Sequence, residues 1–207
     1  MQIDKEIENL NINLIKMCDV VCKNIKEAFE AYQRENEVAY INDDVVNQYE
    51  RLIEELCLDI LIRQRPYSKD LRTIIGILKL VSDLERIGDH AEDIMEFTKK
   101  LIKEEDVLCV EVSQMVSICL DMVNNSILSY TNKDLELAKR VINNDDIIDR
   151  MYEEAVLRLI DKKSTRSFAI YTTLVVKYIE RICDHCVNIA EWVIYMINGF
   201  YKDKKIF

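Results

Sequence analysis

The sequence of this chain predicts an all-α protein of six helices, arranged as two tandem, pseudo-symmetric three-helix bundles. Three observations lead to this prediction. The 207 residues include 3 Gly and 1 Pro, the residues that most often mark turns and hairpins. Apolar residues recur at helical spacing along nearly the whole chain. An acidic motif also occurs twice, as expected of a duplicated unit.

The periodicity places six helices between short breaks. Their expected ranges are 3–33, 36–63, 69–103, 108–130, 134–162 and 166–201. Pro66 marks the second break, because a proline disfavours helix in the residue before it. Ser68 is expected to cap the third helix, where Asp70 suits the positive end of the helix dipole. Asn132 and Ser164 are the expected N-caps of the fifth and sixth helices.

The internal repeat sets the domain organisation. Residues 85–96 read ERIGDHAEDIME, and residues 180–191 read ERICDHCVNIAE. Upstream, INDDVVNQYE at 41–50 resembles NNDDIIDRMYE at 143–153. The two units are therefore expected to span residues 1–104 and 105–207.

Composition excludes several classes of function. The formal net charge is -10, and an acidic surface repels nucleic acid and anionic lipid. No apolar run approaches the roughly 20 residues of a membrane span, so no membrane insertion is expected. The polar, acidic start does not resemble a secretory signal. Seven scattered cysteines, mostly at apolar positions, suit a reducing cytoplasm.

The repeated motif forms an acidic stripe on a helical wheel. Glu85 and Asp89 share one face, and Ile87 and Ile94 lie opposite. In the second unit, the acids Glu180 and Asp184 lie opposite the isoleucines Ile182 and Ile189. Such a stripe can simply be the solvated face of an acidic helix. It can also be a cation site, because like charges at i and i+4 repel each other and a bound metal relieves that repulsion.

Other residues of the motif have simpler interpretations. His90 and His185 lie at the flank of the acidic face, where a structural or supporting role is favoured over direct ligation. Cys183 and Cys186 form a CxxC, but the matching residues Gly88 and Ala91 suggest small fillers at a close helix contact.

The repeated sequence motifs resemble the signature of the PhoU family of phosphate-signalling proteins. LERIGDHAEDI at 84–94 and IERICDHCVNIAEW at 179–192 carry the resemblance, together with RPYSKDLR at 65–72. It spans essentially the whole chain and implies two similar three-helix bundles with surface metal sites. The ligands that it implies are Asp43, Asn47, Glu85 and Asp89 in the first unit, and Asp145, Asp149, Glu180 and Asp184 in the second. The implied ions are divalent or trivalent, namely iron, zinc, manganese or magnesium.

The resemblance also implies a function without catalysis. Family members act as negative regulators of the phosphate-starvation response, between the ATPase subunit of the phosphate ABC transporter and a phosphate-sensing histidine kinase. A cytoplasmic homodimer or higher homo-oligomer is expected. The alternative is a ferritin-like metal-storage or oxidase protein, whose ligands would point into the bundle with Glu-x-x-His spacing. A relative that serves another transporter is a third interpretation.

Overall fold

The structure, a computed structural model, describes residues 2–33, 41, 43–101, 110–161, 164–202 and 204–205. Six helices make up nearly all of it and confirm the predicted all-α fold. They are α1 (Gln2–Tyr32), α2 (Asp44–Gln64), α3 (Ser68–Leu101), α4 (Val110–Asn132), α5 (Leu135–Asp161) and α6 (Arg166–Asn198). Two short strands, β1 (Phe200–Tyr201) and β2 (Lys204–Lys205), pair after α6. No helix within the described ranges is long and apolar enough to cross a membrane.

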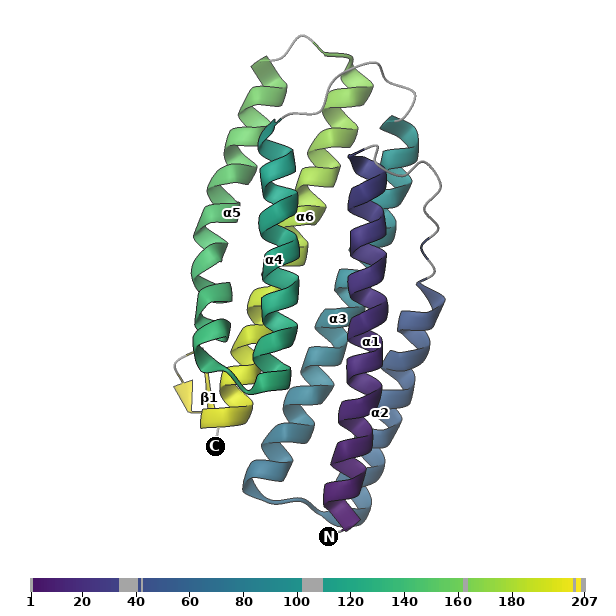
Figure 1. Cartoon of the computed structure of the whole chain (residues 1–207), viewed down its shortest axis with the longest axis vertical. Helices are drawn as coiled ribbons and strands as arrows, with labels where there is room; N and C mark the ends of the chain where they lie inside the picture. Colours follow the sequence, from purple (N-terminus) through teal and green to yellow (C-terminus); the bar gives the residue numbers. More distant parts are fainter. Residues whose placement is uncertain are drawn as a thin grey trace.

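The helices pack as two groups of three. α1, α2 and α3 contact one another, as do α4, α5 and α6, and Figure 1 shows the two groups side by side along the long axis of the molecule. The most extensive contact between any two helices joins α3 to α6. The two helices that carry the repeated acidic motif therefore form the seam between the bundles. The expected boundary between residues 104 and 105 lies outside the described residues.

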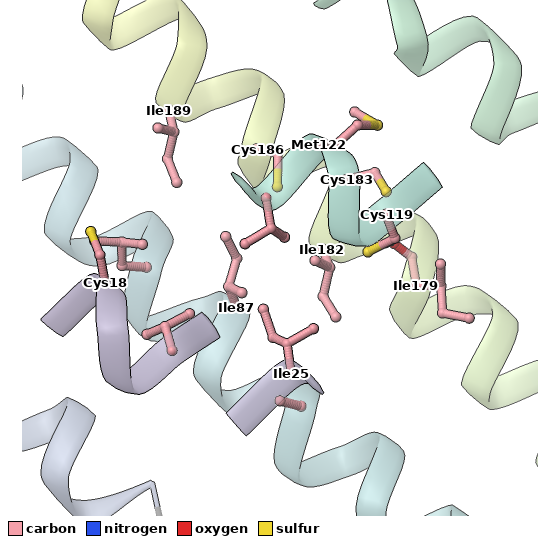
Figure 2. Packing of buried hydrophobic residues seen from close by; sticks show 14 of the residues in the cluster. Cys18, Ile25, Ile87, Cys119, Met122, Ile179, Ile182, Cys183, Cys186 and Ile189 are labelled. Atoms are coloured by element: carbon pink, nitrogen blue, oxygen red, sulfur yellow. The ribbon is translucent and has the colours of Figure 1, made fainter. Parts of the chain in front are cut away.

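One hydrophobic core runs through both bundles. Buried residues from all six helices belong to a single cluster, and Figure 2 shows Ile25 of α1 and Ile87 of α3 close to Ile182 of α6. The four isoleucines that the wheel places inside, Ile87, Ile94, Ile182 and Ile189, are all at most 1% exposed. That part of the prediction is confirmed.

Two helix ends lie three or more residues from their predicted positions. The second helix begins at Asp44, and the described residues Ile41 and Asp43 are not helical. Asp43 and Asp44 at this start supply the negative charge that a helix N-terminus favours. The sixth helix ends at Asn198 and not at 201, because Gly199 adopts φ 80° and its N–H donates to the Tyr195 carbonyl at 2.7 Å.

Two of the expected caps are also corrected. Asn132 is the last residue of α4, and the cap of α5 is Asp134, whose Oδ1 accepts from the backbone N–H groups of Glu136 and Leu137. α6 is capped by Thr165, whose Oγ1 accepts from the N–H of Phe168 at 3.1 Å. Ser164 lies one residue too early to reach that N–H group.

Candidate functional site

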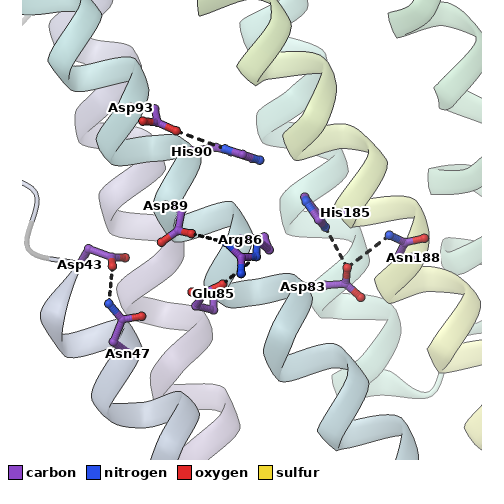
Figure 3. A network of polar contacts seen from close by, with 10 residues as sticks. All are labelled: Asp43, Asn47, Asp83, Glu85, Arg86, Asp89, His90, Asp93, His185 and Asn188. Atoms are coloured by element: carbon purple, nitrogen blue, oxygen red, sulfur yellow. Dashed lines mark hydrogen bonds and ion pairs between the residues drawn. The ribbon is translucent and has the colours of Figure 1, made fainter.

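The first acidic cluster comprises Asp43, Asn47, Glu85 and Asp89, where the start of α2 meets the middle of α3 (Figure 3). Asp43 is 9% exposed, and its Oδ2 accepts from Asn47 Nδ2 at 2.6 Å. Gly88 permits this approach, since a Cβ at that position would lie 3.1 Å from Asp43 Oδ1. A glycine thus lets a carboxylate sit against the α3 backbone.

Glu85 and Asp89 lie one turn apart on α3 and share a counter-ion. Arg86 places Nε 3.2 Å from Glu85 Oε2 and Nη1 2.9 Å from Asp89 Oδ2. The Glu85 side chain is 14% exposed and that of Asp89 is 30% exposed. The expectation of fully solvent-facing acids is therefore too simple for Glu85. Its carboxylate is largely covered, and Oε2 is buried.

The electrostatics of the first cluster oppose full ionisation. Burial raises the pKa of Glu85 to about 6, and the nearby charge of Asp89 adds to this effect. Burial also raises the pKa of Asp43, again with Asp89 as the next cause. Glu50 belongs to the same neighbourhood, because the charge of Asp89 is among the causes that raise its pKa, after burial and the charge of Glu54. Several carboxyl groups lie close together here, and either protonation or a bound cation would reduce the repulsion between their negative charges.

The second acidic cluster comprises Asp145, Asp149, Glu180 and Asp184, on α5 and α6. Burial raises the pKa of Asp145 to about 6, followed by the charges of Asp149 and Asp184. Burial and the charge of Glu180 raise the pKa of Asp184. Lys177 is the local counter-ion, with Nζ 2.5 Å from Glu180 Oε2. The sequence motif therefore builds the same kind of electrostatic environment in both bundles.

The two clusters share an unusual hydrogen-bonding pattern. Buried oxygens at matching positions accept no hydrogen bond: Asp43 Oδ1 and Glu85 Oε2 in the first cluster, Asp145 Oδ1 and Glu180 Oε2 in the second. The two glutamate oxygens do lie near Arg86 and Lys177, but without hydrogen-bond geometry. Buried polar atoms usually find partners, and carboxylate oxygens are preferred ligands of hard divalent cations. The donor set therefore fits a cation.

The clusters are not gathered around a single point. Among the residues described, no three His, Cys, Asp or Glu side chains converge closely enough to hold a metal ion. A cation would have to draw the carboxylates together.

The histidines and cysteines of the repeated motif do not belong to the acidic clusters. His90 and His185 meet across the seam between α3 and α6, with ring centroids 5.7 Å apart. Cys183 and Cys186 are fully buried, and burial raises the pKa of both thiols well above the usual value. Figure 2 shows both next to Cys119 and Met122 of α4. Their predicted role as core fillers is confirmed.

Sequence reasoning overlooked some polar partners. Asp83 accepts hydrogen bonds across the seam from α6, and Lys177 neutralises part of the second cluster. Asp83 lies outside the repeated word, so the repeat gives no reason to select it. Lys177 could have been found from its i, i+3 spacing to Glu180.

Comparison with known proteins agrees with this architecture. The family model described as PhoU domain matches residues 14–98 and 112–193. The chain belongs to the PhoU family. Each of the two matched segments covers one of the acidic motifs on α3 and α6 together with its upstream partner helix.

Relatives over the full length support the assignment. A phosphate-specific transport system accessory protein PhoU homolog of Aquifex aeolicus is 36% identical, covering 96% of this chain and 94% of its own length. The homolog of Clostridium acetobutylicum is 31% identical, with 97% and 96% covered. The crystal structure of PhoU from Pseudomonas aeruginosa superposes with a TM-score of 0.86 at 34% identity, covering 95% of this chain and 99% of that one. The Aquifex and Clostridium relatives are named as accessory proteins of a phosphate-specific transport system, and not as enzymes.

Proposed function

We propose that this chain regulates phosphate uptake and phosphate-starvation signalling as a cytoplasmic, metal-binding adaptor. Its partners would be the ATPase subunit of a phosphate ABC transporter and a phosphate-sensing histidine kinase, and it would act as a homodimer or higher homo-oligomer. The single observation that carries the proposal is membership of the PhoU family over both halves. The names of the full-length relatives support the link to phosphate transport.

The proposed metal sites are the two acidic clusters. Asp43, Asn47, Glu85 and Asp89 would hold one ion, and Asp145, Asp149, Glu180 and Asp184 would hold another. The buried carboxylate oxygens that accept no hydrogen bond and the raised pKa values of Glu85 and Asp145 support this assignment. Oxygen donors suit magnesium or manganese best, and iron or zinc are also accommodated. A bound cation would neutralise surface that is otherwise strongly acidic.

The ferritin-like alternative is less well supported. Such proteins place several carboxylates in the bundle interior, whereas Asp43 is the one carboxylate among the buried residues of the described chain. Metal-dependent oxygen consumption by the purified protein would revive that alternative.

The regulatory role is tested by gene deletion in the organism that encodes this chain. In phosphate-replete medium, deletion should raise phosphate-uptake gene expression and phosphate uptake, and the wild-type gene should restore both. A variant in which Glu85, Asp89, Glu180 and Asp184 are all changed to Ala should restore gene expression and uptake poorly. Immunoblots should show that this variant accumulates to the wild-type level. No change on deletion would refute the regulatory proposal. Full restoration by the quadruple variant would refute the role of metal.

A further inference from the structure

The chain contains two histidines in all, and the fold brings both to one place. They lie in the two copies of the repeated motif, 95 positions apart (90 and 185). Figure 3 shows His90 reaching from α3 toward α6 and His185 reaching from α6 toward α3. Their ring centroids are 5.7 Å apart, at an interplanar angle of 37°. Two imidazoles on adjacent helices thus face a common space at the seam.

Each imidazole is held by a carboxylate through Nδ1. His185 Nδ1 lies 2.8 Å from Asp83 Oδ1, and Asn188 Nδ2 donates to the same oxygen at 3.2 Å. His90 Nδ1 lies 3.5 Å from Asp93 Oδ2. A carboxylate only accepts hydrogen bonds, so Nδ1 carries the proton and Nε2 of the neutral ring keeps its lone pair. Histidines that ligate metals through Nε2 are oriented by this same carboxylate contact.

Both imidazoles are partly exposed to solvent. The side chain of His90 is 11% exposed and that of His185 is 22% exposed. Arg181 lies over the ring of Tyr178, whose centroid is 5.2 Å from that of His90.

We propose that His90 and His185 form a two-histidine site for a divalent transition-metal ion such as Zn²⁺, at the seam between α3 and α6. The site is separate from the two acidic clusters. Two Nε2 atoms supply the protein ligands, and water completes the coordination shell. Imidazole donors favour zinc, copper and nickel over the magnesium and manganese that carboxylates prefer. Asp83 and Asp93 are positioning residues, which fix the ring tautomers.

The test uses the full chain labelled with ¹⁵N in histidine, which gives ring signals from two imidazoles alone. Zn²⁺ is added in the presence of excess Mg²⁺, which competes for carboxylate oxygens. The Nε2 signals of both histidines should shift together and reach a common end point at one equivalent of Zn²⁺. Absence of any shift, or a shift of one ring alone, would overturn the proposal.

Two sets of variants separate this site from the acidic clusters. His185→Asn keeps a donor toward Asp83 but removes the Nε2 ligand, and it should weaken the Zn²⁺ response of His90 at least about tenfold. Asp83→Asn should weaken it by about 10- to 100-fold without removing either imidazole. Glu180→Gln with Asp184→Asn should leave both imidazole shifts unchanged. If that pair abolished the shifts instead, the zinc would belong to the second acidic cluster, and the two-histidine site would be refuted. Thermal melts of each variant verify that the fold is intact.

Discussion

Glu85 illustrates how a surface carboxyl can be held under electrostatic strain. It lies on the outer side of α3, yet its side chain is 14% exposed and Asp89 follows it by one turn. The Arg86 guanidinium offsets part of the repulsion. Burial, followed by the charge of Asp89, nevertheless raises the pKa of Glu85 to about 6, above the usual value near 4.5.

This pKa predicts the sign of a pH effect on stability. A carboxyl whose pKa is raised in the folded state binds its proton more tightly when folded. Its unfavourable contribution is therefore absent below about pH 4.5, grows between pH 4.5 and 6, and is complete above pH 6. Glu85→Gln should then stabilise the metal-free protein at pH 7.5 by about 1 kcal/mol, after allowance for solvent screening. Melting temperature should rise by about 2–4 °C.

The control for this variant lies on the same helix. Glu96 is exposed and its pKa is lowered by a hydrogen bond from Lys100 at 2.6 Å. Glu96→Gln should give no stabilisation at pH 7.5. The melting temperatures of both variants, measured in the presence of a metal chelator at pH 4.5 and 7.5, are compared with those of the wild type. If Glu85→Gln raised the melting temperature equally at the two pH values, the raised pKa of Glu85 would not be the cause of the stabilisation.

At the scale of single helices, the start of α6 offers a direct test of capping. Thr165 Oγ1 accepts from the Phe168 N–H, whereas the buried Ser164 Oγ accepts and donates no hydrogen bond. Thr165→Ala should therefore cost about 1 kcal/mol. Ser164→Ala, one residue away, should cost almost nothing. Urea unfolding of the two variants compares them, and a larger loss from Ser164→Ala would show that the cap is misassigned.

The two acidic clusters should also differ in metal affinity. The second offers four carboxylates, and the first offers three with the neutral Asn47, whose amide already donates to Asp43. Affinity for divalent ions increases with the number of charged ligands. Glu180→Ala with Asp184→Ala should therefore remove more bound Mn²⁺ than Glu85→Ala with Asp89→Ala. Calorimetric titration of both double variants measures this, and an equal or smaller loss from the second cluster would mean that carboxylate count does not decide affinity.

Helix existence and orientation could be predicted from the sequence, but helix ends and tertiary partners could not. The spacing of Ile87 and Ile94 determines which face is buried, because that information is local. The choice between Ser164 and Thr165 depends on backbone angles at one residue, which composition does not determine. The contact of His185 with Asp83 joins residues about 100 positions apart, so it follows from the packing of α3 on α6 and from no local pattern.

At the scale of the whole molecule, the shared core predicts a single unfolding transition. Ile87 of the first bundle is fully buried, and Ile87→Ala should cost about 2–5 kcal/mol. The one tryptophan, Trp192, lies on α6 in the second bundle. Its fluorescence transition in urea should nevertheless shift to lower denaturant, together with the far-UV circular dichroism of the whole chain.

The matched control is Ile62→Ala on α2, where the side chain is 73% exposed. It should leave the transition nearly unchanged. If Ile87→Ala left the Trp192 midpoint in place while circular dichroism split into two phases, the bundles would be shown to unfold independently.

The seam between α3 and α6 also bears on how such a chain could have arisen. A gene for one three-helix unit would have produced a protein with an apolar face along its third helix, exposed to water. Pairing of two identical copies through that face would have covered it, since a two-fold dimer uses the same patch on both subunits. In such an ancestor, each histidine at the seam would have met its own symmetry mate. Duplication and fusion of the gene would then have turned an association that depended on concentration into a permanent one, and would have left the two halves free to diverge around a fixed contact.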